Sequence, residues 1–351
     1  MAELTKTIGT NSRDYATIQA WANDLDDGTN AANDATAYQA GDTAKGVIYD
    51  DSDFDEDVNI SLGGTIGLIG ITLTVLEADR HTGLPNTGAR VLMTGNQSFD
   101  ALSSAVPTII EWLEIDWNGN GFNGSFGIEL NGSATTIHEL RNCILHGALD
   151  TSNMEVIHIS DSARVYNNII YNCGSTSAIT RDAVGIKELS TSTDVFEIYN
   201  NSIENIYNTN GDGKCYGIWW NDDNAAKKIR NNICYNIQGT TTGEILDYKM
   251  PSTQNNTVIT NNADQDSSLP NANGNVRGIA DPFTNTATGN FLLANVGECE
   301  DAGVDLGTTP TGVEIDILGR DRDDEGDTWD IGAHELVVVG GRVPHTQGHI
   351  F

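Results

Sequence analysis

The sequence predicts an all-β fold in which short strands stack in parallel, turn upon turn, into a β-solenoid. Three observations support this prediction. A strand motif centred on Asn recurs along the chain, a second strand motif with a central Ile precedes it in each repeat, and the 37 glycines mark many turns. Because a repeat that cannot bury its own apolar face must stack on its neighbours, such repeats indicate a solenoid.

The first motif sets an Asn pair among apolar residues at alternate positions. It reads RVYNNIIYNCG, IYNNSIENIYN, KIRNNICYNIQ and TQNNTVITNNA, with a weaker version, LRNCILHG, upstream. Aligned, these segments predict one stacked column made of Asn142, Asn168, Asn201, Asn232 and Asn256. Asn tolerates the left-handed bend between strands, and stacked Asn side chains hydrogen-bond along a column. We therefore interpret the Asn pairs as structural.

The second motif is a short strand with period-2 alternation. It reads FGIELNG, EVIHISD, VGIKELS, YGIWWND and GEILDYK. Alternation places one side of each strand toward a shared core. The prediction is an inward column made of Ile128, Ile157, Ile186, Ile218 and Ile245.

The two ends of the stack need covers, and the sequence offers one for each. TIGTNSRDYATIQAWANDL predicts a strand and an amphipathic helix, with Asp14 as N-cap and an apolar face formed by Ile18, Trp21, Ala22 and Leu25. The polar tract after residue 262 predicts a wrap over the last turn. We divide the single domain into a cap (1–28), parallel coils (29–262) and a C-terminal wrap and tail (263–351).

These segments resemble right-handed parallel β-helix proteins of the pectate-lyase-like superfamily. The coil pattern matches over residues 126–262, and DPFTNTATGNFLL, DAGVDLG and DILGRDRDDEGDTWDIGAHE are similar to the closing segments of bacterial and phage β-helix proteins. The resemblance implies a right-handed β-helix and a phage virion-associated, tailspike-like protein. It leaves the oligomeric state open, with a homotrimer as one candidate. It supplies no catalytic motif that matches residue by residue.

Composition limits the partners. The chain has 50 acidic and 18 basic residues and a net charge of -32, which disfavours nucleic acid and anionic membrane surfaces. The start, MAELTKTIG, lacks the features of a signal peptide, and no apolar run is long enough to span a membrane. We expect a virion or extracellular location. The five cysteines show no paired spacing and are predicted to be buried apolar residues.

The residue after each Ile should point outward, and these residues predict a glycan-binding strip. Glu129, His158, Lys187 and Trp219 would form an exposed ladder, with Arg181 beside it on a loop. Trp219 would stack on a sugar ring, and Lys187 or Arg181 would bind an acidic sugar. A plain solvated face is the competing interpretation, which would leave a purely structural virion protein.

Catalysis on the same face is a further alternative. A glycoside hydrolase needs two carboxyl groups, and a polysaccharide lyase needs acidic Ca²⁺ ligands beside a basic group. The candidates are Asp182, Lys187, Asp222 and Asp223. NTNGDGK resembles the first half of an EF-hand loop, so Asn208, Asn210 and Asp212 are weak Ca²⁺ candidates; Trp219 stands where that loop needs Glu. No cofactor is otherwise indicated.

Overall fold

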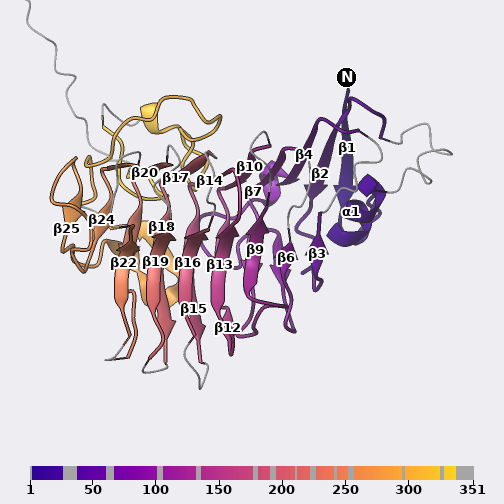
Figure 1. The fold of residues 1–351 in the computed structure, drawn as a ribbon. Coiled ribbons are helices and arrows are strands. Elements are labelled where there is room, and N and C mark those ends of the chain that lie inside the picture. Colours follow the sequence, from indigo (N-terminus) through magenta and orange to yellow (C-terminus); the bar gives the residue numbers. More distant parts are fainter. Residues whose placement is uncertain are drawn as a thin grey trace, which may run out of the picture.

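The structure is a computed structural model. It describes residues 2–26, 38–60, 67–100, 106–131, 136–176, 181–189, 195–209, 212–221, 227–240, 243–251, 257–294, 297–324 and 328–336. Three parallel sheets dominate it (Figure 1). The predicted all-β class with parallel strands is confirmed.

Each sheet takes one strand from each repeat, so that β13, β14 and β15 lie in three different sheets and are followed there by β16, β17 and β18. Sheet A contains β1 (Glu3–Ile8), β2 (Thr43–Ile48), β4 (Gly70–Val75), β7 (Thr108–Glu111), β10 (His138–Arg141), β14 (Ala163–Tyr166), β17 (Phe196–Tyr199), β20 (Lys227–Arg230) and β23 (Val258–Thr260). Sheet B contains β5 (Arg90–Leu92), β8 (Glu114–Asp116), β11 (Ile144–His146), β15 (Ile169–Ser175), β18 (Ser202–Asn208), β21 (Ile233–Tyr235), β24 (Ala263–Asp264) and β25 (Val276–Arg277), with β12 (Leu149–Asp150) also on β15. Sheet C contains β3 (Val58–Asn59), β6 (Phe99–Asp100), β9 (Phe126–Leu130), β13 (Met154–Ile159), β16 (Ala183–Glu188), β19 (Cys215–Trp220) and β22 (Ile245–Lys249).

The predicted Ile column is correct at four of its five positions. Ile128, Ile157, Ile186 and Ile218 lie opposite one another in sheet C and are fully buried. The fifth position belongs to Tyr248, and Ile245 lies opposite Cys215 instead. Tyr248 is the residue that fills the core at this level, and its hydroxyl donates to the Asn232 carbonyl at 2.8 Å.

The buried Asn column also differs from the prediction at its ends. Its members are Asn168, Asn201, Asn232 and Asn262, all fully buried, followed by Asn275. Cys143 holds the first place, because its N–H donates to Oδ1 of Asn168. Asn256 lies outside the described residues. The alignment failed there because the last pair is Asn261–Asn262, which follows β23 directly.

Asn142 belongs to a second column, formed by the first Asn of each pair. Its members are Asn142, Asn167, Asn200, Asn231 and Asn261, all with φ between 52° and 58°. This left-handed backbone turns the chain from sheet A into sheet B and suits Asn better than most residues.

The C-terminal segment forms hydrogen bonds with this second column. Side-chain amides of Asn142, Asn167, Asn200, Asn231 and Asn261 donate to the carbonyls of Asp316, Ile315, Val313, Val304 and Ala302, respectively. The segment thus runs back along the stack, whereas a wrap over its last turn was predicted. Past residue 262, β24 and β25 still extend sheet B. The yellow trace of Figure 1 lies over β14, β17 and β20 accordingly.

A second apolar cluster fixes the C-terminal segment on the outer side of sheet B. Ile144, Ile169 and Ile233 of the sheet pack there with Phe283, Phe291 and Ile331. A short hairpin, β26 (Phe283–Asn285) and β27 (Asn290–Leu293), supplies two of these rings. The segment also contains two short helices, η3 (Thr286–Thr288) and η4 (Arg322–Asp324), while η2 (Glu77–Asp79) lies earlier in the chain.

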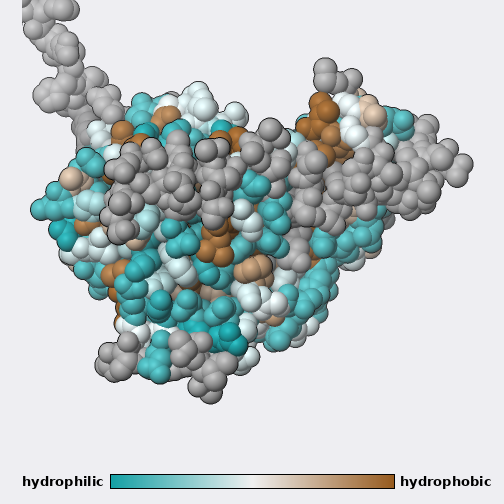
Figure 2. Space-filling view, viewed as in Figure 1, coloured by the Kyte–Doolittle hydropathy of each residue, from teal (hydrophilic) through white to brown (hydrophobic). Residues whose placement is uncertain are grey.

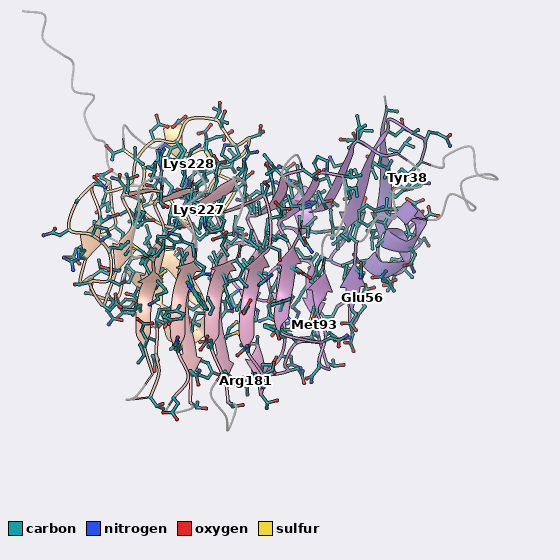
Figure 3. All side chains as sticks on the ribbon, in the orientation of Figure 1. Tyr38, Glu56, Met93, Arg181, Lys227 and Lys228 are labelled. Carbon is teal, nitrogen blue, oxygen red and sulfur yellow. The ribbon has the colours of Figure 1, made fainter. Side chains whose placement is uncertain are left out.

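The N-terminal helix α1 (Ile18–Asp26) packs against β2 and β3 through its predicted apolar face. Ile18, Trp21, Ala22 and Leu25 are buried in the main core. The predicted N-cap is wrong: Thr17 caps the helix by accepting the N–H of Ala20 at 3.0 Å, and Asp14 accepts from Thr7 instead. Glu56 reaches across to the N–H groups of Ile18 and Gln19, and Figure 3 shows it beside the helix.

Buried groups elsewhere agree with the sequence. All five cysteines are buried and free, as predicted. Among the described residues, no helix is both long enough and apolar enough to cross a membrane.

Candidate functional site

Sheet C carries the predicted ladder. Glu129, His158, Lys187 and Trp219 lie directly opposite one another on neighbouring strands, and Lys249 continues the column. The face of Figure 2 that corresponds to sheet C in Figure 1 is mostly teal and white, with small brown patches. The sequence therefore placed these four side chains correctly relative to one another.

The middle of the ladder is not the open strip that was expected. His158 and Lys187 are only 5% and 8% exposed, because both turn toward Glu155, itself 3% exposed. His158 Nδ1 lies 2.5 Å from the Glu155 carboxylate, and the Lys187 ammonium donates to its other oxygen. The Phe126 ring stacks on His158 with centroids 3.9 Å apart.

The charges of this cluster are matched internally. Burial disfavours ionisation of Glu155, but hydrogen bonds and charge from His158 and Lys187 outweigh it and hold the pKa of the carboxyl below its usual value. Lys187 is thus committed to Glu155. This removes it as the predicted contact for an acidic sugar and as a free catalytic base.

Trp219 remains half-buried at the edge of the cluster. The Lys187 ammonium lies 4.4 Å from its ring centroid, and Tyr216 packs against it at 5.2 Å. Lys249 pairs with Glu244 at 2.8 Å and Glu244 accepts the Tyr216 hydroxyl. The rings of Tyr216 and Trp219 and the paired ammonium groups of Lys187 and Lys249 therefore form the end of the ladder.

The other candidates are spread over several places. Arg181 and Asp182 precede β16, and Figure 3 shows Arg181 near the lower turns of the stack. Asp182 accepts the N–H of Lys214 at 3.3 Å. Asn208 is 3% exposed and donates to the carbonyls of Arg181 and Lys214, while Asp212 is exposed. Asn210, Asp222 and Asp223 lie outside the described residues.

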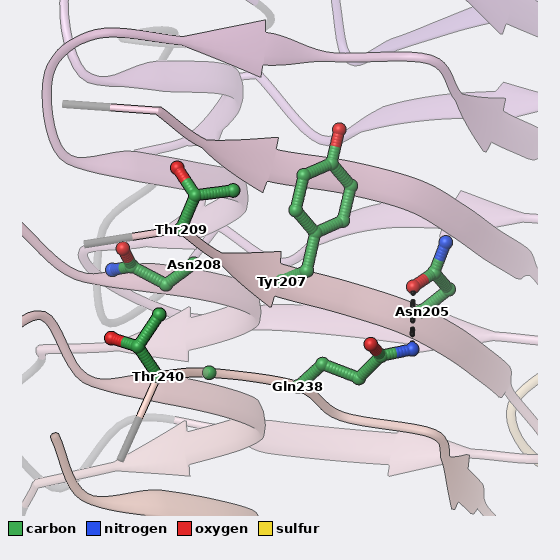
Figure 4. A pocket seen from close by; sticks show the side chains of 7 residues that line it. Asn205, Tyr207, Asn208, Thr209, Gln238 and Thr240 are labelled. Carbon is green, nitrogen blue, oxygen red and sulfur yellow. Dashed lines mark hydrogen bonds between the residues drawn. The ribbon is translucent and has the colours of Figure 1, made fainter. Parts of the chain in front are cut away.

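A pocket of about 440 Å³ opens close to these turns, at the C-terminal end of strand β18 in sheet B (Figure 4). It is lined by Asn205, Tyr207, Asn208, Thr209, Gln238, Gly239 and Thr240, none of which carries a charge. In Figure 4 the Tyr207 ring stands between the amides of Asn205 and Gln238 on one side and Thr209 on the other.

Tyr207 owes its position to a glycine. It lies opposite Gly174 on β15, and a Cβ at Gly174 would come within 2.3 Å of the Tyr207 ring. One side of the ring therefore packs closely against backbone, and the half-buried ring lines the pocket. Any larger residue at position 174 would displace it.

The pocket amides lead inward to a buried carboxyl. Gln238 Nε2 donates to Asn205 at 3.2 Å and to Asn236 at 2.7 Å, and Asn236 Nδ2 donates to Glu204 at 2.7 Å. Burial raises the pKa of Glu204 to about 7, and the Asn236 hydrogen bond offsets only part of this rise. The network links a solvent-facing amide to a group that titrates near neutrality.

Sequence reasoning missed this pocket, although a signal was present. In the segments YNCG, ENIY and YNIQ, an Asn stands four residues after the second Asn of each pair. Asn172, Asn205 and Asn236 all adopt a left-handed backbone there, which turns their side chains outward as a third Asn column.

Comparison with known proteins finds no family model that matches the chain and no matching curated protein.

Proposed function

We propose that the chain is a right-handed parallel β-helix module of a phage virion that binds glycans. The observation that carries the proposal is the pocket around Tyr207. It combines the half-buried ring of Tyr207 with amide and hydroxyl groups from Asn205, Thr209, Gln238 and Thr240. An aromatic ring beside convergent polar groups suits a pyranose, whose CH groups pack on the ring while its hydroxyls take hydrogen bonds.

The charges favour a neutral glycan. The pocket lining is uncharged, the chain carries a net charge of -32, and Lys187 is bound to Glu155. None of the residues that line the pocket is a cation that could offset the repulsion of a polyanionic sugar by this acidic chain. A chain of neutral hexoses is therefore the favoured ligand, rather than the acidic sugar expected from the ladder.

A glycan array with three variants tests the proposal. Tyr207→Ala should abolish binding to the neutral glycan, while Tyr207→Phe keeps the ring and should bind within a fewfold of wild type. Trp219→Ala tests the rival surface on sheet C. Loss of binding in Trp219→Ala alone would move the site to the ladder, and no binding by the wild type would favour the structural alternative.

The enzyme alternative has its own readout. A polysaccharide lyase or glycoside hydrolase would release reducing ends from the glycan identified on the array. Asp182→Asn would then reduce the release if the predicted candidate is catalytic. The homotrimer and the virion location are proposals too, and mass measurement in solution and immunolabelling of particles test them.

A further inference from the structure

A second cluster of side chains lies on the outer face of sheet B, away from the glycan pocket. Glu114 and Asp116 project from β8 on one face, and His146 lies directly opposite Asp116 on β11. One donor atom from each of the three lies within 4.8 Å of the others. His146 Nε2 is 2.9 Å from Glu114, and Nδ1 is 3.6 Å from Asp116.

We propose that Glu114, Asp116 and His146 bind a divalent cation of the Zn²⁺ type. An imidazole nitrogen together with two carboxylates is a ligand set for zinc, with a fourth position left to water. On coordination, any proton carried by the ligating imidazole nitrogen would be released to solvent. The imidazole nitrogen of His146 distinguishes this cluster from the chain's exposed acidic groups, which offer carboxylate oxygens alone.

The charge balance supports a cation. Glu114 is fully buried, and Asp116 is only 14% exposed at its side chain. Arg90 is the neighbouring guanidinium, 3.7 Å from Asp116, but it is also paired with Asp53 at 2.9 Å. The carboxylates of Asp53, Glu114 and Asp116 thus share one guanidinium, and negative charge is left for a cation to offset.

The surroundings hold the three ligands in place. The N–H of Asn86 donates to Oε2 of Glu114, the carboxylate oxygen that does not face His146. The N–H of Asn118 donates to Asp116, and both distances are 2.7 Å. Tyr171 stacks on the imidazole with ring centroids 4.7 Å apart and planes 7° apart. Such outer partners fix ligand orientation in metal sites.

A glycine keeps the space beside Asp116 open. Gly147 has φ of +77°, and a Cβ there would approach Asp116 Oδ1 to 2.7 Å. Its neighbour His146 is one of the ligands, so the backbone turn and the ligand are adjacent. The lack of a side chain at position 147 therefore lets the Asp116 carboxylate lie against the backbone beside His146.

Equilibrium dialysis of the full chain with ZnCl₂ tests the proposal, with Co²⁺ absorption as a report on ligand geometry. The wild type should bind one Zn²⁺ at this site and show a raised thermal midpoint. Asp116→Asn, which preserves size and hydrogen bonding, should weaken binding about tenfold or more, since even outer partners are worth that much. His146→Gln should abolish it.

The matched control is His158→Gln, because His158 also pairs with a buried Glu but has Lys187 where the third ligand would be. Zn²⁺ binding should be unchanged in that variant. Absence of Zn²⁺ binding by the wild type would overturn the proposal. Undiminished binding in both Asp116→Asn and His146→Gln would overturn it as well, and Asp116→Asn decides the matter if His146→Gln does not fold.

Discussion

The side-chain amide of Asn201 donates to Oδ1 of Asn232 at 2.9 Å, deep inside the protein. The same Asn201 accepts both the N–H and the side-chain amide of Asn168, at 3.1 and 3.0 Å. Each buried Asn therefore ties its own coil to the one on either side, and the column acts as a continuous connection through the core.

Replacing Asn201 with Ala should destabilise the fold by about 3 kcal/mol. Two buried donors of Asn168 lose their shared acceptor, and an unsatisfied buried group costs about 1–3 kcal/mol. Urea denaturation measures the change. Asn275→Ala is the control, because Asn275 ends the column and is itself partly exposed. Equal losses in both variants would contradict the role of burial.

Replacing Ile186 with Asp should unfold the protein. Ile186 is fully buried between Ile157 and Ile218, and an unpaired buried carboxylate costs several kcal/mol. Circular dichroism should show loss of the strand signal. Ile69→Asp, at a side chain that is 50% exposed, should leave the spectrum and the midpoint nearly unchanged.

Replacing Lys187 with Ala should cost about 3–5 kcal/mol, since it leaves the buried Glu155 without its ammonium partner. This reverses the expectation that the side chain is free on the surface. Lys249→Ala is the control: its pair with Glu244 is far more exposed and should be worth about 0–1 kcal/mol. A Lys187→Ala variant as stable as wild type would show that Glu155 does not need this partner.

Glu204 should make stability depend on pH. Burial raises its pKa to about 7 in the folded chain from 4.5, so its contribution is fully present below pH 4.5 and is lost as pH rises through 7. Glu204→Gln keeps the shape and removes the titration. Unfolding midpoints compared at pH 5 and pH 8 should fall less for Glu204→Gln than for wild type; parallel falls would show that the carboxyl does not titrate there.

Deleting residues 1–28 should yield aggregates. The deletion removes helix α1 and β1, exposes the part of the core that Trp21 covers, and frees the edge of β2, which pairs with β1 along its whole length. Open sheet edges pair with other chains. Size-exclusion chromatography with light scattering measures the outcome, and a monodisperse product would mean that the cap is dispensable.

The repeat itself was readable from the sequence because its period is enforced by packing. Ile128, Ile157, Ile186 and Ile218 had to align, since a one-residue slip would turn each strand inside out. The motif changes in the last repeat, where Tyr248 takes the place predicted for Ile245 and Asn262 follows Asn232 in the Asn column. Pattern matching had no means of weighing those substitutions.

The surface was harder to predict, because alternation states which way a side chain points and not what covers or pairs with it. Lys187 does point outward from β16. Glu155 on the adjacent strand β13 nevertheless pairs with both Lys187 and His158, so neither side chain is free. The Tyr207 pocket depends on Gly174 one coil away, and the Glu114 cluster depends on His146 across a strand pair. Such contacts depend on register between coils, which only the folded chain supplies.

The first-Asn column has a consequence for how such a chain can change in length. Its five amides meet five carbonyls of one antiparallel segment, from Asn142 with Asp316 to Asn261 with Ala302. The spacing of these carbonyls must therefore match the spacing of the Asn column. A longer loop between strands leaves that match intact, but a duplicated repeat shifts the Asn residues beyond it by about 4.8 Å relative to the carbonyls. Selection can therefore vary the loops freely, whereas adding a coil requires a matching insertion more than 40 residues further along the chain.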